Sequence, residues 1–372
     1  MKKTAKRELF VFAGQSNMMG AAVFPPQVEP QIKDSYEYKH KPRRLGAGEG
    51  RFVKAGYPTG EFSYVDLQKA YGADMVDENG KSRLGDYNKN TYFCPAMSNL
   101  KSEQERALYP FFFFSESTAQ HGATLAPLLA AEWEELGGRC AFAHIAKGGV
   151  SIDYYFTDEM ALEYQHRITR YNKENNKTYA DTVLESNRMH GAADYFFEKC
   201  NHFFEDAEKR FVGEELSNKC FCWLQGESDT QMAEIEYQIR LDILWERLKA
   251  IGFTHFFCIR VDYFGSSGIY RVMRAQERFV AEHPDAYMLT RAASFFTFPG
   301  QNEQEWFVSP PDDTYRNCRD SCFGYKNNHI NEKGFALLAK RAAKNLYRVL
   351  VESKEAVPEE ENVRSLILDA CE

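Results

Sequence analysis

The chain has 372 residues, of which 44% are hydrophobic, and it carries a net charge of -8 with a pI near 5.7. This length allows one large domain or two ordinary ones, and the hydrophobic content is enough for a full core. The acidic balance, without an arginine-rich patch, argues against partners such as nucleic acid or an anionic membrane.

The sequence shows no targeting signal and no membrane span. Met1–Arg7 is basic, but the apolar run after it has only five residues and lacks a small-residue cleavage site. No segment approaches the ~20 apolar residues that cross a bilayer. Nine cysteines, an odd number, are scattered along the chain and indicate reduced thiols. We therefore expect a cytoplasmic protein.

Apolar runs predict five β-strands, and helical patterns separate most of them. Strands that alternate with helices imply a parallel sheet covered on both faces, with every carboxyl end at one edge. The predicted strands are Glu8–Ala13, Cys140–Ala146, Lys219–Leu224, His255–Val261 and Ala286–Arg291. The predicted helices are Leu125–Leu136, Tyr195–Phe211, Met232–Ile251, Arg271–Glu282 and Glu332–Val351.

Three stretches lack this alternation of strand and helix patterns. Residues 21–115 are rich in Pro, Gly, Tyr and charge, and a loop of that length is expected to be a lid or a substrate-binding insertion. Residues 154–187 and 297–328 are polar, with many Tyr and Asn. The sequence thus predicts a single α/β domain over 1–353 with three insertions, followed by an acidic tail over 354–372.

Ser16 is the first candidate for chemistry. It lies two residues beyond Gly14, where the predicted strand Glu8–Ala13 breaks, and open α/β sheets place their active sites at such strand ends. The motif is not the Gly-x-Ser-x-Gly elbow, because position 18 is Met. The alternative is an ordinary serine in a strand-to-loop turn.

Polar turns also follow the second and third predicted strands. Gln225-Gly-Glu-Ser-Asp229 places a glycine and polar side chains directly after a strand. It is equally consistent with a capping turn, in which Ser228 or Asp229 caps a helix starting near Gln231. Lys147-Gly-Gly-Val-Ser151 allows close backbone approach and, taken alone, reads as a plain loop.

Two further residues are candidates by position. Gly122 precedes the predicted helix that begins at Leu125, so its N–H is expected at a positive helix end. His329 comes just before Asn331, a natural N-cap for the last predicted helix. This placement puts His329 within reach of the carboxyl ends of the strands.

Together these features resemble the SGNH hydrolase superfamily, and within it the sialate O-acetylesterase and acetylxylan esterase group (carbohydrate esterase family 6). The resemblance covers most of the chain apart from 21–115. It implies a three-layer α/β/α sandwich with a five-stranded parallel, flavodoxin-like sheet, and no metal or organic cofactor. The motifs that carry the resemblance are Gly14-Gln-Ser-Asn-Met18, Gly148-Gly149, Trp223-Leu-Gln-Gly-Glu-Ser-Asp229, and His329-Ile330-Asn331 with Gly334.

The resemblance also implies roles for single residues. Ser16 is expected to be the nucleophile and His329 the general base. The oxyanion hole is expected to comprise the N–H groups of Ser16 and Gly122 with the side chain of Gln225. Substrate-binding residues are expected in the same motifs, namely Gln15, Asn17, Gly148, Gly149, Glu227 and Asp229.

One position departs from the family pattern. The family usually carries an Asp three residues before the histidine, where this chain has Lys326, which has only donors and cannot accept the imidazole N–H. Three substitutes are conceivable: the carboxylate of Asp320, a backbone carbonyl near Lys326 or Asn327, or the side chains of Asn327 and Asn328. We take Asp320 as the candidate orienting residue.

The function expected from the resemblance is a serine esterase that removes O-acetyl groups from a carbohydrate through an acetyl-Ser16 intermediate. One alternative is a catalytically weak or silent carbohydrate-binding protein of the same fold. Another is a lipid or thioester hydrolase. Cys318 and Cys322 have a four-residue spacing but no second pair nearby, so no metal site is expected.

Overall fold

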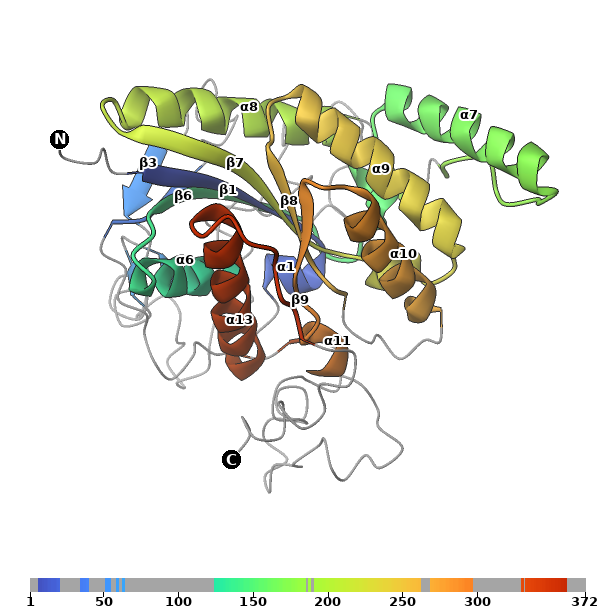
Figure 1. Ribbon diagram of the computed structural model, residues 1–372. Helices are drawn as coiled ribbons and strands as arrows, with labels where there is room; N and C mark the ends of the chain where they lie inside the picture. The colour runs from blue at the N-terminus through green and yellow to red at the C-terminus, as the bar shows by residue number, and fades with distance from the viewer. Residues whose placement is uncertain are drawn as a thin grey trace, which may run out of the picture.

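The computed structural model describes residues 6–20, 34–39, 51–54, 58–59, 62–63, 124–184, 187–188, 191–261, 268–296, 329–330 and 332–359. A seven-stranded sheet in the order β3-β2-β6-β1-β7-β8-β9 lies at its centre (Figure 1). The strands are β1 (Lys6–Gly14), β2 (Tyr36–Lys39), β3 (Arg51–Lys54), β6 (Cys140–Ala146), β7 (Glu215–Leu224), β8 (His255–Ile259) and β9 (Ala286–Thr290).

The five predicted strands lie side by side in this sheet and are parallel to one another, in the order β6-β1-β7-β8-β9. Numbered among themselves they run 2-1-3-4-5, the flavodoxin-like order, so the predicted sheet is confirmed. Gly14 at the end of β1 pairs with Ala146 on one side and Leu224 on the other. The carboxyl ends of β1, β6 and β7 are therefore level, and the segments that follow them meet.

The insertion 21–115 contributes strands that its sequence did not indicate. β2 pairs parallel to β6, and β3 pairs antiparallel to β2, which extends the sheet at one edge. A two-stranded hairpin, β4 (Pro58–Thr59) with β5 (Phe62–Ser63), follows. Strands of two to four residues are too short to show an alternating pattern. The expected lid or binding role belongs to residues outside the described ranges and stays a prediction.

Arg7 ties the start of this extension to the main sheet. Its side chain is 1% exposed and donates to the backbone oxygen of Asp34 at 2.7 Å and to Glu214 at 2.8 Å. The guanidinium carbon lies 4.4 Å from the ring centroid of Phe211. A buried charge is tolerated only when paired in this way.

Helices cover both faces of the sheet and make three layers (Figure 1). Leu9 and Val11 of β1 face α8, α9 and α10, whereas Phe10 and Phe12 face α6 and α13. The covering helices are α6 (Leu125–Glu135), α7 (Asp158–Asn175), α8 (Ala192–Arg210), α9 (Glu234–Ala250), α10 (Ile269–Glu282) and α13 (Glu332–Leu350), with short helices α1 (Ser16–Met19) and α11 (Ala293–Phe296).

Five of these helices match the predicted ones to within a few residues, and α7 was missed. It lies inside 154–187, which the sequence analysis took for a polar insertion without helical rhythm. Its buried residues are only Met160, Tyr164 and Ile168, a stripe too narrow to stand out in a polar segment. The Thr157 hydroxyl caps its start by accepting from the N–H of Met160 at 3.3 Å.

The start of α9 also differs from the expectation. Ser228 and Asp229 do not cap it, because Glu227–Asp229 forms a short 3-10 turn and α9 begins at Glu234. The carboxylate of Glu236 instead accepts from the N–H of Ala233 at 2.6 Å. Across the described ranges, no helix has both the length and the apolar character to cross a membrane.

Gly14 is required where β1 meets β7. A Cβ at this position would lie 1.9 Å from the carbonyl oxygen of Leu224, and the backbone has φ +150°. Any side chain at position 14 would therefore push β1 and β7 apart at the point where their backbones meet.

We predict that Gly14→Ala lowers the free energy of unfolding by about 3 kcal/mol or more, since it combines overpacking with backbone strain. Gly137→Ala is the matched control: it has φ +86° but no atom within 4 Å of its Cβ, so only the strain of about 1 kcal/mol applies. Urea denaturation of both variants measures the difference. Equal losses would show that the contact with Leu224 does not matter.

Candidate functional site

Ser16 begins α1 directly after the bend at Gly14, and its side chain is half-buried. The bend is fixed by Tyr155, whose hydroxyl accepts from the N–H of Gly14 at 3.0 Å and donates to its carbonyl at 2.6 Å. One buried phenol thus satisfies both backbone groups of the glycine, which holds Ser16 at the carboxyl edge of the sheet.

The residues on either side of Ser16 join it to the turn after β7. The N–H of Gln15 donates to the carbonyl of Leu224 at 3.2 Å, and the Gln15 side chain accepts from the N–H of Ser228 at 3.3 Å. Asn17 donates its amide to the carboxyl of Glu227 at 2.8 Å. The serine is therefore held from both neighbours.

Asn17 also reaches the far end of the chain. Its Oδ1 accepts from the N–H of Ile330 at 3.0 Å, although the two residues are 313 positions apart. This bond joins residues that directly follow Ser16 and His329, so it brings both chain segments to one place. Asn17 and Ile330 are fully buried, whereas Ser16 and His329 are half-buried.

The turn after β6 forms another wall beside Ser16. A Cβ built on Gly148 would lie 3.8 Å from the Cβ of Ser16 and 3.1 Å from the Cε of Met19. The N–H of Lys147 donates to the carbonyl of Gly14 at 3.0 Å, which holds this turn against the end of β1. Burial lowers the pKa of Lys147. The glycine pair predicted as a backbone-approach turn is thus adjacent to Ser16.

Gln225 does not face Ser16 as an oxyanion donor. Its amide nitrogen donates to the carbonyl of Val150 at 3.1 Å and to the carboxyl of Asp229. Its Oε1 accepts from the hydroxyl of Tyr237 at 2.7 Å. An amide has two N–H donors and protein groups take both of them, so the role expected for this side chain is wrong.

Asp229 lies at the centre of a buried polar cluster behind the turn after β6. Its Oδ2 accepts from the N–H of Ile152 at 3.0 Å as well as from Gln225. Burial, with the negative charge of Asp153 added, raises the pKa of Asp229 from an ordinary 3.8 to about 7, against the lowering effect of its hydrogen bonds. Asp153 itself is paired with the buried Arg240 at 2.6 Å.

Most of the residues expected to bind substrate are inside the protein. Gln15, Asn17, Glu227 and Asp229 are 2%, 0%, 3% and 1% exposed, and all four make hydrogen bonds to protein groups. They hold the site together and do not contact a substrate, which corrects the expectation.

The other predicted site residues divide into two groups. Gly148 is half-buried and lies beside Ser16, and Gly149 is exposed. Gly122, Asp320 and Lys326 lie outside the described residues. The sequence analysis missed Tyr155 as a support for Ser16; its aromatic neighbours pointed only to packing.

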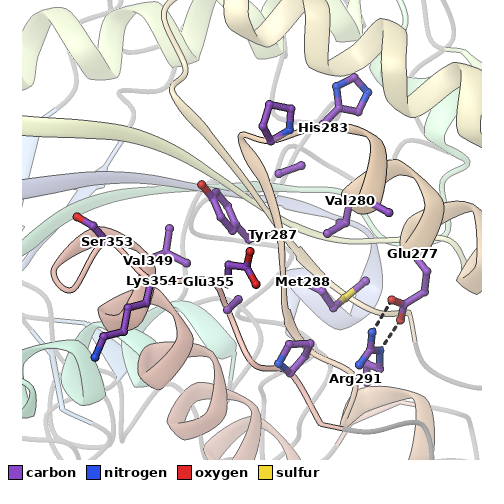
Figure 2. Close-up of a pocket in the computed structure, with 15 residues that line it drawn as sticks. Glu277, Val280, His283, Tyr287, Met288, Arg291, Val349, Ser353, Lys354 and Glu355 are labelled. Carbon is purple, nitrogen blue, oxygen red and sulfur yellow. Dashed lines mark hydrogen bonds and ion pairs between the residues drawn. The ribbon is translucent and has the colours of Figure 1, made fainter.

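A cavity of about 720 Å³ lies elsewhere, along the outer side of the edge strand β9 (Figure 2). Tyr287 and Met288 of β9 face it, and Ser353 and Lys354 line the opposite side. β9 is three strands from β1, about 14 Å at the usual strand spacing, and none of the site residues described above lines the cavity. It is not part of the Ser16 site.

We predict that Asp229→Asn removes a pH dependence of stability. Because the pKa of Asp229 is higher in the folded than in the unfolded protein, the folded protein binds a proton at this group that the unfolded chain has lost. The stabilisation is therefore fully present below about pH 4 and is lost as the pH rises through 7. The wild-type unfolding free energy should fall relative to Asp229→Asn by up to about 4 kcal/mol across this window. Urea denaturation at pH 4 to 8 measures it; parallel curves would contradict the prediction.

No protein-family model matches the chain, and no curated protein matches it. Among solved structures, the chain is similar to a protein from Arabidopsis thaliana at 12% identity, over 91% of this chain and 96% of that one, with a TM-score of 0.44. It is also similar to NanS at 10% identity, over 95% of this chain and 100% of that one, with a TM-score of 0.49. A third similar structure is a carbohydrate acetylesterase from Xanthomonas citri, at 13% identity over 94% of this chain and 57% of that one, with a TM-score of 0.42.

Proposed function

We propose that the protein is a serine ester hydrolase that removes acetyl groups from a carbohydrate. The observation that carries the proposal is the hydrogen bond from Ile330 N–H to Asn17 Oδ1, which joins the segments of Ser16 and His329 at the carboxyl edge of the sheet. Acyl transfer needs a hydroxyl within reach of an imidazole, and this link supports the proposal because it joins the residues that directly follow Ser16 and His329.

In the first step the Ser16 hydroxyl attacks the ester carbonyl, and His329 takes its proton. The proton then passes from His329 to the departing sugar hydroxyl, which leaves an acetyl group on Ser16. In the second step His329 takes a proton from water, the hydroxide attacks the acetyl carbonyl, and acetic acid leaves as His329 returns the proton to the Ser16 oxygen; the released acid then ionises to acetate in solvent. The chemistry uses only groups of this chain and water.

The negative charge on the carbonyl oxygen needs N–H donors. We assign them to the backbone of Ser16 and of Gly148, because Gly148 is the residue whose backbone approaches Ser16 across the turn after β6. Within the described ranges, neither N–H donates a hydrogen bond. A donor of this kind is worth roughly 3 kcal/mol in known acyl-transfer enzymes. Gly122, outside the described residues, remains an untested alternative.

The Asn17 side chain controls the position of His329. Its amide nitrogen donates to Glu227, so its oxygen is the atom turned towards the N–H of Ile330. Glu227 therefore fixes the orientation of the carboxamide, and the carboxamide fixes the backbone next to His329. This holding compensates in part for Lys326, which stands where the family pattern has an acid. Asp320 stays a proposal as the group that orients the imidazole.

A small acyl group agrees with the surroundings of Ser16. The half-buried Met19 side chain lies against Gly148, so its thioether occupies space next to the turn that flanks the serine. A short acetyl group needs less room there than a long acyl chain. The carbohydrate part of the proposal rests on the motif resemblance, and the lipid or thioester alternative predicts a preference for long acyl chains.

We predict that Ser16→Ala and His329→Ala each lower the hydrolysis of p-nitrophenyl acetate by about 10³-fold or more, since each removes a group that bonds to or moves a proton in the transition state. The same assay with acetylated sugars and with longer acyl esters tests the substrate. Equal rates for wild type and Ser16→Ala would favour a silent carbohydrate-binding protein. A larger loss for Asp320→Asn than for His329→Ala would reverse their assigned importance.

We predict that Asn17→Ala lowers kcat by about 10- to 100-fold with little change in KM, because His329 loses its register to Ser16 while the substrate contacts remain. The matched control is Asn345→Ala. Asn345 is also buried and joins two segments, Leu289 and Val357, at 2.7 and 2.8 Å, but far from Ser16.

Both asparagine variants should lower the melting temperature, and only Asn17→Ala should lower kcat. A similar kcat for the two variants would show that the link to Ile330 plays no part in catalysis.

A further inference from the structure

Asp229 is a buried acid that the proposed mechanism does not use. It is 1% exposed and lies at the end of the 3-10 turn after β7, so it cannot contact a substrate. Its Oδ2 receives two donors, the N–H of Ile152 at 3.0 Å and the amide of Gln225. The N–H of Ile152 belongs to the turn after β6, and the Gln225 amide also donates to a carbonyl of that turn. The same turn places Gly148 beside Ser16.

The turn after β6 is held at two backbone points, which lie two and four residues after Gly148. The carbonyl of Val150 accepts from the Gln225 amide at 3.1 Å, and the N–H of Ile152 donates to Asp229. The Ser151 hydroxyl between them accepts from the N–H of Asp153 at 3.2 Å. Asp229 and Gln225 thus provide one acceptor and one donor, which pair with backbone groups on either side of Ser151 in this turn.

The other end of this contact is anchored in the helical layer. Tyr237 of α9 donates to the Oε1 of Gln225 at 2.7 Å, and Gln276 of α10 donates to the Gln225 carbonyl at 2.8 Å. Gln225, Tyr237 and Gln276 are all fully buried. The turn is therefore connected to α9 and α10 through buried, hydrogen-bonded side chains.

We propose that Asp229 is a positioning residue that sets the place of the Gly148 N–H relative to Ser16, acting through Gln225 and the backbone of Val150 and Ile152. The inference rests on the proposed function, since it assigns Gly148 to the oxyanion. It gives the motif Gln225–Asp229 a task other than substrate binding: the motif holds the neighbouring turn at the distance that the oxyanion requires.

The chemistry of Asp229 explains which replacement preserves this role. Only one of its oxygens, Oδ2, accepts the two donors, while Oδ1 has no hydrogen-bond partner within the described residues. An asparagine can present its single oxygen to the same donors and place its amide nitrogen where Oδ1 lies. An alanine removes the acceptor and leaves two buried donors unsatisfied.

The test compares Asp229→Ala and Asp229→Asn with the wild type, using p-nitrophenyl acetate as substrate. Glu8→Ala is the matched control, because Glu8 is also a buried carboxylate that accepts a backbone N–H, that of Asn218 at 3.0 Å, but at the amino end of β1. Asp229→Ala should lower kcat about 10- to 100-fold at nearly constant KM. Asp229→Asn should stay within about threefold of wild type, as should Glu8→Ala.

A second readout does not depend on activity. Amide hydrogen exchange of residues 147–152 should be faster in Asp229→Ala than in wild type, and unchanged in Glu8→Ala and Asp229→Asn. If Asp229→Ala does not fold, Tyr237→Phe replaces it, since it removes the donor that anchors Gln225 while keeping the ring; it should speed the same exchange and lower kcat.

The outcomes separate the two proposals. Hydrolysis by wild type no greater than by Ser16→Ala refutes the proposed function, and the exchange data then decide the holding role alone. Hydrolysis with an unchanged kcat in Asp229→Ala refutes the positioning role and leaves the esterase intact. A loss in Asp229→Asn equal to that in Asp229→Ala refutes the hydrogen-bonding basis.

Discussion

The carboxamide of Asn17 is the contact on which the candidate site depends. Its two polar atoms are turned in opposite directions, the nitrogen to Glu227 and the oxygen to the N–H of Ile330. An amide held at both ends in a buried environment has one orientation, because reversing it would face a donor with a donor. One side chain thereby sets the relation between three segments that are distant in the sequence: those that follow β1 and β7, and the one that precedes α13.

The surrounding polar groups follow the same logic. Around Ser16, the backbone of Gly14 is satisfied by Tyr155, and the turn after β6 by Gln225 and Asp229. Buried donors and acceptors cost free energy unless they are paired, so each pair specifies a distance as well as stabilising the fold. The motifs near the strand ends are thus rich in polar residues mainly because they hold one another.

This explains which parts of the structure the sequence could predict. The five parallel strands and five helices were readable, since each contributes a long apolar stripe such as Leu9–Ala13 or the phenylalanines of α8. Helix α7 and strands β2 and β3 were not, because the buried stripe of α7 is narrow and the two strands have only four residues each. Tertiary contacts, and not local pattern, decide such elements.

The same distinction applies to the site. Motif order correctly placed Ser16 and His329 on segments that meet, but it could not tell a side chain that faces substrate from one that faces the protein. Gln225, Glu227 and Asp229 belong to the second kind, as their burial shows. The direction of a side chain that follows a strand depends on the turn residue, here Gly226 with φ +141°. The periodicity of the sequence does not reveal this direction.

The place of β1 in the sheet has a consequence for biosynthesis. β1 is synthesised before both of its partner strands, which begin at Cys140 and Glu215, and before the segment of Ile330 that bonds to Asn17. Contacts of such long range are slow to form. β1, which is buried from Arg7 to Gly14 in the folded protein, therefore stays unpaired until these later segments have been synthesised, and its apolar side chains are open to aggregation during that time.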